Sequence, residues 1–244
     1  MESFWGRMPR PFFVLAPMAD VTDPAYRRLI AETHGPDVTW TEFVSADGLY
    51  HTRERKGTEG ERPIVAQLFG SDPDTMRYAA SLCAELGFDG IDINMGCPDR
   101  SIEKQGAGAA MIKSIENARA VIHAARESGL PVSVKTRIGY NQETIDEWLS
   151  ALLSENLPAL TVHLRTRKEM SKVSAHWELM PRIVELRNAS SPGTLIVGNG
   201  DVADLEDARV KLDASGADGA MLGRAIFGNP WVFAGRKSED IAPR

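Results

Sequence analysis

One of the two cysteines stands where a thiol could do chemistry. Cys97 lies between Gly96 and Pro98, in a turn that follows an apolar run. A cysteine whose pKa stays near its ordinary value of about 8.5 is neutral at pH 7 and can donate a proton, whereas nearby cations would make it a nucleophile. The nucleophile needs a base, and the sequence does not identify one. Cys97 is therefore a candidate acid, with the nucleophile as the alternative.

Cationic side chains come in pairs at the ends of two further apolar runs. Lys135 and Arg137 are two residues apart, as are His163 and Arg165, so each pair projects from one side of a strand. Four such groups gathered together would repel each other unless an electron-rich molecule lay between them. A flavin fits, because its reduced ring carries negative charge that a lysine or histidine stabilises. The pattern predicts a flavin site.

Two glycine turns follow the last two apolar runs, Asn199-Gly200-Asp201 and Gly223-Arg224. Gly-rich turns with an arginine nearby are typical of phosphate sites in barrels. Neither turn has the Rossmann spacing of a dinucleotide site. The turns therefore predict one phosphate group, as in FMN.

Each of these residues also has an ordinary structural explanation. A cation at a strand end is commonly part of a rim salt bridge, a histidine can be a hydrogen-bonded core residue, and Gly-Asn-Gly is a common turn. Their combination at successive strand ends favours a functional site. Cys83 lies in an apolar helical pattern, where a buried thiol without a role is expected. No cysteine pair has ligand spacing and no His-Glu cluster is present, so we expect no metal site.

The elements that must position these residues alternate along the chain. Apolar runs predict strands at 12–18, 38–44, 63–69, 90–95, 131–138, 159–164, 194–197 and 219–222. Helical periodicity lies between them at 24–33, 74–86, 115–127, 145–155, 177–186 and 205–214. Continuous apolar strands indicate a parallel sheet covered on both faces, and eight such units in about 230 residues match a (β/α)8 TIM barrel. We expect an α/β fold with one catalytic barrel domain over 1–235, a truncated eighth helix and a polar tail over 236–244.

Local signals mark the ends of several helices. Asp23 and Asp72 each precede a proline and are predicted N-caps, while Gly87, Gly129 and Gly216 follow the last periodic residues. The polar residues 51–62 are expected to form a long surface loop or a short helix near the rim. A barrel places its working residues at the carboxyl ends of its strands, which is where the cysteine, the cations and the glycine turns fall.

Composition limits the partners. The 244 residues carry a net charge of −6, which excludes a surface that attracts polyanions throughout. Any RNA contact must be local. No targeting segment or membrane span is evident, and with no disulfide framework we expect a cytoplasmic protein with no membrane partner.

Six segments, in order, resemble those of tRNA-dihydrouridine synthases. They are Leu15 to Asp23, Gln67 to Gly70, Ile91 to Pro98, Val134 to Gly139, Asn199 to Asp201, and Gly223 to Trp231. The likeness runs from about Phe12 to Phe233 and implies an FMN-dependent barrel that uses NADPH and acts on tRNA. It implies that FMN is held by Pro17, Met18, Ala19, Gln67, Lys135, His163, Asn199, Gly200, Asp201, Gly223 and Arg224. Cys97 matches the catalytic cysteine.

The resemblance also implies a reaction in two halves. NADPH passes a hydride to the flavin, and the hydride then goes to C6 of a uracil extruded from the RNA while Cys97 protonates C5. Asn94, Arg137 and Arg165 would hold the uracil carbonyls. Members of the family usually carry a helical RNA-binding domain after the barrel, whereas this sequence stops soon after Phe233. We therefore expect a fragment, a chain completed by a partner, or a minimal form that binds tRNA weakly.

Two other functions remain open. A flavin barrel of the dihydroorotate dehydrogenase or ene-reductase type would act on a small molecule and shares Lys and Asn at strand ends. The turn at 95–98 and the segment 228–231 favour the RNA-modifying family. A barrel that binds flavin or RNA without turnover is disfavoured, because Cys97, Lys135 and His163 are all present.

Overall fold

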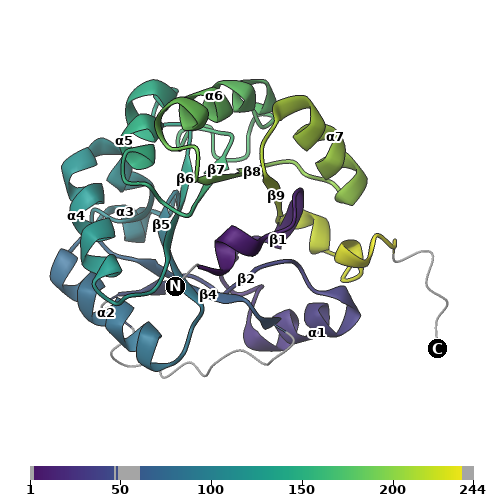
Figure 1. Ribbon diagram of the computed structural model, residues 1–244, viewed down its shortest axis with the longest axis horizontal. Coiled ribbons are helices and arrows are strands. Elements are labelled where there is room, and N and C mark those ends of the chain that lie inside the picture. Colours follow the sequence, from purple (N-terminus) through teal and green to yellow (C-terminus); the bar gives the residue numbers. More distant parts are fainter. Residues whose placement is uncertain (1–2, 47, 49–60, 238–244) are drawn as a thin grey trace.

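The computed structural model describes residues 3–46, 48 and 61–237, and its parallel strands form a nearly closed barrel (Figure 1). The strands are β1 (Phe12–Leu15), β2 (Thr39–Trp40), β3 (Val44–Ser45), β4 (Ile64–Phe69), β5 (Gly90–Met95), β6 (Val132–Arg137), β7 (Ala159–His163), β8 (Leu195–Asn199) and β9 (Gly219–Leu222). Their order is β1-β9-β8-β7-β6-β5-β4-β2, with β3 also on β4. A parallel bridge between Val14 and Val38 joins β1 to the segment before β2. The predicted TIM barrel is confirmed.

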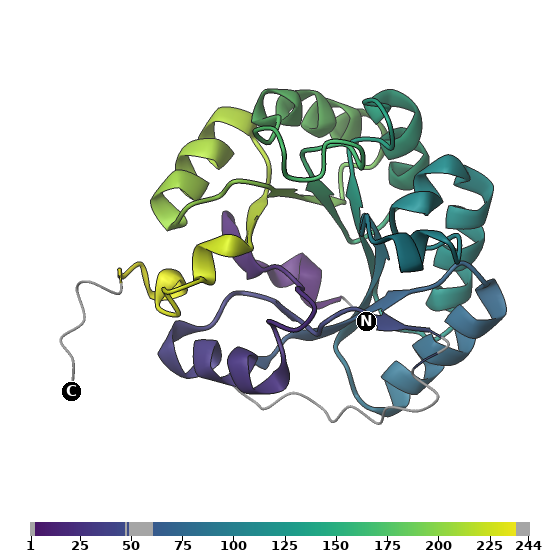
Figure 2. The ribbon, with the colours of Figure 1, turned by 180° about the vertical axis from the view of Figure 1, so that it is seen from behind.

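Helices surround the barrel, as Figures 1 and 2 show from its two sides. They are α1 (Pro24–His34), α2 (Pro73–Glu85), α3 (Arg100–Glu103), α4 (Ile115–Arg126), α5 (Ser150–Leu153), α6 (Met180–Ser190) and α7 (Leu205–Ser215). The 3-10 helices are η1 (Phe4–Arg7), η4 (Gly108–Lys113), η6 (Trp177–Leu179), η7 (Arg224–Ile226) and η8 (Val232–Ala234), and η5 (Ile145–Leu149) is a π-helix. None of the described helices is long and apolar enough to cross a membrane.

The predicted helix ends are confirmed. Asp23 caps α1 by accepting a hydrogen bond from the Tyr26 N–H at 2.7 Å, and Asp72 caps α2 by accepting one from Thr75 N–H at 2.8 Å. Gly216 ends α7 with φ of 71°, a left-handed conformation that glycine adopts without a steric penalty.

Three predicted elements are divided in the structure, and one of them is the helix expected over 177–186, which is η6 followed by α6. The strand expected over 38–44 is divided into β2 and β3, because Thr41 replaces part of the ladder: its Oγ1 accepts a hydrogen bond from Gln67 N–H at 3.0 Å. The helix expected over 145–155 is the π-helix η5 followed by the short α5. Most of the loop expected over 51–62 lies outside the described residues, as does the tail from 238.

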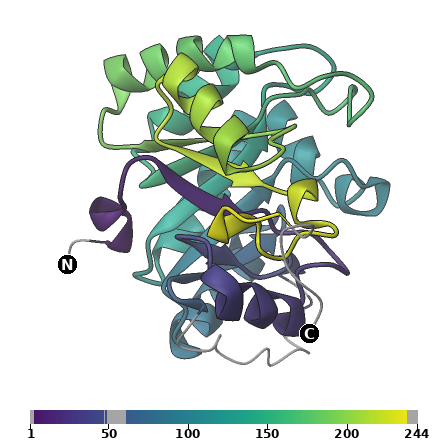
Figure 3. The same cartoon turned by 90° about the vertical axis from the view of Figure 1, so that its right-hand side faces the viewer.

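The apolar core has two layers, and their arrangement leaves one end of the barrel to polar groups. One layer packs the outer face of the sheet against the helices. The other fills the barrel interior and includes Phe12, Val65, Val197 and Met221. Trp5 of η1 joins this inner layer and contacts Phe12 and Trp40, so η1 covers the amino-terminal end of the barrel (Figure 3). The polar interior side chains therefore gather toward the carboxyl ends of the strands.

Candidate active site

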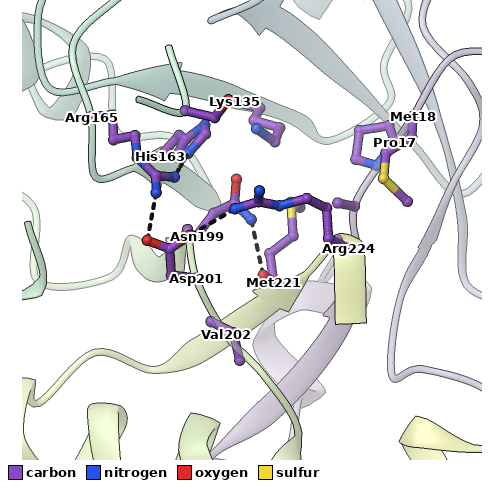
Figure 4. A pocket seen from close by; sticks show the side chains of 14 residues that line it. Pro17, Met18, Lys135, His163, Arg165, Asn199, Asp201, Val202, Met221 and Arg224 are labelled. Carbon is purple, nitrogen blue, oxygen red and sulfur yellow. Dashed lines mark hydrogen bonds and ion pairs between the residues drawn. The ribbon is translucent and has the colours of Figure 1, made fainter. Parts of the chain in front are cut away.

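A cavity of about 230 Å³ opens at the carboxyl ends of β1, β6, β7, β8 and β9 (Figure 4). Ten of the predicted site residues line it: Pro17, Met18, Lys135, His163, Arg165, Asn199, Gly200, Asp201, Gly223 and Arg224. Four lining residues were not predicted: Ala16, Ser171, Val202 and Met221. Strand alternation could have found Met221, which faces inward on β9, but nothing in the sequence marks Ser171.

The strand register brings Lys135 and His163 to one wall of the cavity. Arg137 pairs with His163 across β6 and β7, and His163 pairs with Asn199 across β7 and β8. Burial and, to a smaller extent, the charge of Arg137 lower the pKa of Lys135 to about 8, so the amine stays mostly cationic at pH 7. The wall thus presents a cation that is only partly exposed to water.

His163 is a neutral imidazole of defined tautomer. Burial and the charge of Lys135 lower the pKa of His163 well below its usual 6.5. Its Nε2 lies 3.1 Å from Nη1 of Arg165. A guanidinium can only donate, so Nε2 accepts and the proton of the ring belongs to Nδ1. His163 can therefore offer a hydrogen-bond donor without adding charge.

The floor of the cavity is an ion-pair cluster around Asp201. Its carboxylate accepts from Nη2 of Arg165, from Nη2 of Arg224 at 2.8 Å, and from Ala175 N–H at 2.9 Å. The hydrogen bond from Arg165, together with both positive charges, lowers the pKa of Asp201 below its usual value. Arg224 is 64% exposed, so one end of this cluster faces solvent at the cavity edge (Figure 4).

Gly200 is confined between this cluster and the histidine wall. Its φ is 119°, and a Cβ there would lie 2.8 Å from the Ala175 Cβ and 3.1 Å from the His163 ring. Its carbonyl accepts a hydrogen bond from Trp177 Nε1 at 2.7 Å. A side chain at this position would both strain the backbone and displace His163.

Cys97 lies outside the lining of the cavity, in a turn held from several sides. The Oδ1 of Asn94 accepts from Gly96 N–H at 3.1 Å and from Cys97 N–H at 2.9 Å. Arg137 donates from Nε to the Gly96 carbonyl at 2.7 Å, and Ala109 N–H donates to the Cys97 carbonyl at 2.9 Å. Burial raises the pKa of the thiol, so Cys97 is neutral at pH 7. This is the protonation state that an acid requires.

Four other predicted residues lie around the cavity rather than in its lining: Ala19, Gln67, Asn94 and Arg137. Gln67 is fully buried below the mouth, and Asn94 is 6% exposed beside it. Ala19 is exposed in the loop after β1. Arg137 donates to the carbonyls of Thr166 and Met170, and Arg165 donates from Nε to the carbonyl of Val173 at 2.7 Å. The two arginines thus fasten the loop over 166–173.

The arrangement combines a partly buried cation, a neutral ring donor, a cationic edge and a neutral thiol. Such a set can stabilise negative charge on a bound ring and can donate a proton. Within the described ranges, no three His, Cys, Asp or Glu side chains gather closely enough to hold a metal ion.

Comparison with known proteins identifies a family that matches almost the whole chain. A model described as Dihydrouridine synthase (Dus) matches residues 14–243. The probable tRNA-dihydrouridine synthase 2 of Bacillus subtilis (strain 168) is 45% identical over 240 residues, which cover 95% of this chain and 74% of the relative. A probable tRNA-dihydrouridine synthase of Staphylococcus aureus (strain COL) is 44% identical over 242 residues, covering 95% and 73%.

Solved structures share the barrel at much lower identity. Morphinone reductase is similar with a TM-score of 0.62 and 16% identity, over 94% of this chain and 86% of the other. A variant of NCR from Zymomonas mobilis is similar with a TM-score of 0.62 and 16% identity, over 94% and 89%. At this identity, the likeness concerns the fold alone.

Proposed function

The chain belongs to the dihydrouridine synthase family and is therefore an oxidoreductase, and from this premise we propose that it reduces uridine in tRNA to 5,6-dihydrouridine. We propose FMN as its cofactor and NADPH as the hydride donor. The observation that carries the proposal is the cavity at the barrel mouth, where Lys135 and His163 face Arg224, with the neutral thiol of Cys97 in an adjoining turn. The names of the relatives in two bacteria support the same substrate.

The residues of the cavity fit FMN. Glycine at position 200 lets the backbone pass between Ala175 and His163, where a Cβ would collide with both, so the His163 ring keeps its place in the cavity wall that FMN would meet. Asp201 is neutralised by two arginines, so its carboxylate does not prevent a phosphate from binding beside Arg224. We assign the cofactor contacts to Pro17, Met18, Ala19, Gln67, Lys135, His163, Asn199, Gly200, Asp201, Gly223 and Arg224.

When bound, FMN would supply hydride transfer, and the chain supplies charge, orientation and a proton. Lys135 would stabilise negative charge on the flavin ring, because its amine is mostly cationic at pH 7. His163 donates from Nδ1 without adding a second charge. The reaction adds a hydride to C6 and a proton to C5 of uracil, and we assign the proton to the Cys97 thiol, which its raised pKa keeps protonated.

The substrate base must leave its RNA stack to reach the mouth. Extrusion costs a few kcal/mol, and less where the loop is already unpaired, so a loop uridine is the favoured target. We propose that Asn94, Arg137 and Arg165 contact the uracil carbonyls. Exposed cations near the mouth, Arg100, Lys104, Lys168 and Lys172, are the groups we expect to meet phosphates.

The proposal is tested by the cofactor and then by the substrate. Purified protein should release FMN rather than FAD on denaturation, and a protein that takes up no FMN when supplied would refute the flavin assignment. A small-molecule reductase of the same fold is the competing function. Loaded enzyme should oxidise NADPH faster with tRNA than with orotate or an enone, and the reverse preference would favour the competitor.

A further inference from the structure

Asp92 is a buried carboxylate to which the proposed function gives no role. It lies in the middle of β5, on the inward face that also carries Asn94, and none of its surface is exposed. Its Oδ2 accepts from Nε2 of Gln67 at 2.7 Å, and its Oδ1 accepts from Oγ of Ser133 at 2.7 Å. A carboxylate inside a barrel is costly unless its environment satisfies it. Its register partners on β4 and β6 are the buried polar residues Gln67 and Ser133, so the carboxylate belongs to a polar group inside the barrel.

The hydrogen bonds leading from Asp92 have a fixed direction. An ionised carboxylate only accepts, so Gln67 must turn its Nε2 toward Asp92 and its Oε1 away. That Oε1 accepts from Nδ2 of Asn94 at 3.1 Å. Asn94 is then left with its Oδ1 facing the turn of the candidate acid.

The contacts of Asn94 with the turn at 96–97 require the same direction of hydrogen bonding. Gly96 N–H and Cys97 N–H both donate to Oδ1 of Asn94, at 3.1 and 2.9 Å. Two backbone donors need an acceptor, so an Asn94 amide turned the other way would leave them without a partner. Asp92 at one end and the turn at the other therefore require the same orientation of the Gln67 and Asn94 side-chain amides. This chain of hydrogen bonds runs from Asp92 on β5 to Gln67 on β4 and back to Asn94 on β5. It ends at the backbone of Cys97.

We propose that Asp92 is a positioning residue for Cys97: acting through Gln67 and Asn94, its carboxylate fixes the turn that carries the thiol. The proposal rests on the proposed role of Cys97 as the acid. It assigns Asp92 no contact with cofactor or substrate. Arg137 and Ala109 hold the same turn through its carbonyls, so loss of Asp92 loosens the turn without releasing it.

The test compares variants that remove the acceptor with one that keeps it. Asp92→Leu leaves Gln67 Nε2 without a partner, whereas Asp92→Asn retains one oxygen that can still accept. Gln67→Leu interrupts the chain one step later and decides the question if Asp92→Leu does not fold. Ser133→Ala is the matched control, because it removes the other donor to Asp92 and leaves the chain to Cys97 intact.

The measurement is amide hydrogen exchange at Gly96 and Cys97 in the full chain, read residue by residue by NMR. We expect Asp92→Leu and Gln67→Leu to speed exchange at these two amides by about tenfold, as for the loss of a charge-assisted hydrogen bond. Asp92→Asn should show a smaller change and Ser133→Ala almost none. The double variant Asp92→Leu/Gln67→Leu should exchange no faster than either single variant, because both interrupt one chain.

Two outcomes would overturn the proposal. One is exchange at Gly96 and Cys97 within twofold of the parent in the leucine variants. The other is acceleration spread evenly over the barrel strands, which would mean that Asp92 only stabilises the fold. The readout needs neither flavin nor tRNA, so it is independent of the proposed function. That function is tested at Cys97 itself by the activity of Cys97→Ala.

Discussion

Replacing Asp92 by asparagine should change the free energy of unfolding in a way that depends on pH. Relative to the parent, the variant should gain stability as the pH rises from acid to neutral. Burial raises the pKa of Asp92 from its usual 3.8 to about 6, and the hydrogen bonds from Ser133 and Gln67 do not offset this. The native state therefore holds a proton on Asp92 between these two values while the unfolded state does not. The contribution of that proton to stability is present below the unfolded pKa and is lost as pH rises through 6.

The magnitude follows from the two pKa values. The interval from 3.8 to about 6 corresponds to about 3 kcal/mol in total. Roughly 2 kcal/mol of this falls between pH 4 and pH 7, because the titrations are only partly complete at those limits. Lys135, whose pKa is about 8, stays cationic across this window and adds little to the difference.

The assay is urea unfolding of the flavin-free chain at both pH values, followed by the fluorescence of its five tryptophans. The stability of Asp92→Asn relative to the parent should rise by roughly 2 kcal/mol from pH 4 to pH 7. Asp213→Asn, which removes an exposed carboxylate from α7, is the control. A difference between Asp92→Asn and parent that does not change with pH would refute the reasoning.

Four further predictions concern the cavity and its partners. Cys97→Ala should keep its flavin and its NADPH oxidation but lose uridine reduction by at least about a hundredfold, and tRNA reduction at the parent rate would show that Cys97 is not the acid. Lys135→Met should weaken FMN retention or slow flavin reduction by NADPH, so unchanged occupancy and rate would exclude its role. Gly200→Ala should cost about 1–3 kcal/mol in urea unfolding and reduce FMN uptake, whereas Gly193→Ala, where a Cβ meets nothing within 4 Å, should do neither. The affinity for tRNA should fall with salt as for roughly two to four phosphates, and a steeper slope would reveal an RNA-binding surface larger than the exposed cations near the mouth.

The sequence predicted the barrel because its signals are local. Apolar runs, aspartate caps and terminal glycines each depend on neighbours within a few residues, and the structure confirms the alternation that they indicated. The division of the second strand was not predictable in this way. It depends on Thr41 accepting from the Gln67 backbone, a contact between residues 26 positions apart.

Within the site, spacing predicted which residues would meet but not which partners they would take. Strand ends placed Lys135, His163 and Asn199 around one cavity. The same logic could not indicate that Arg137 fastens loop carbonyls instead of lining the cavity, because the course of the loop is set by tertiary contacts. Asp92 was not predicted as a site residue for a related reason. Its partner Gln67 lies on the neighbouring strand, 25 positions away in the sequence.

Reduction of uridine by the purified chain is the most direct test of the central claim. Unmodified tRNA transcript would be incubated with the protein, FMN and NADPH, then digested and examined by mass spectrometry for a uridine heavier by two hydrogens. We predict that modified uridine forms at defined positions, requires NADPH, and is absent with Cys97→Ala. A flavin-loaded protein that oxidises NADPH but leaves every uridine of the transcript unchanged would contradict the account.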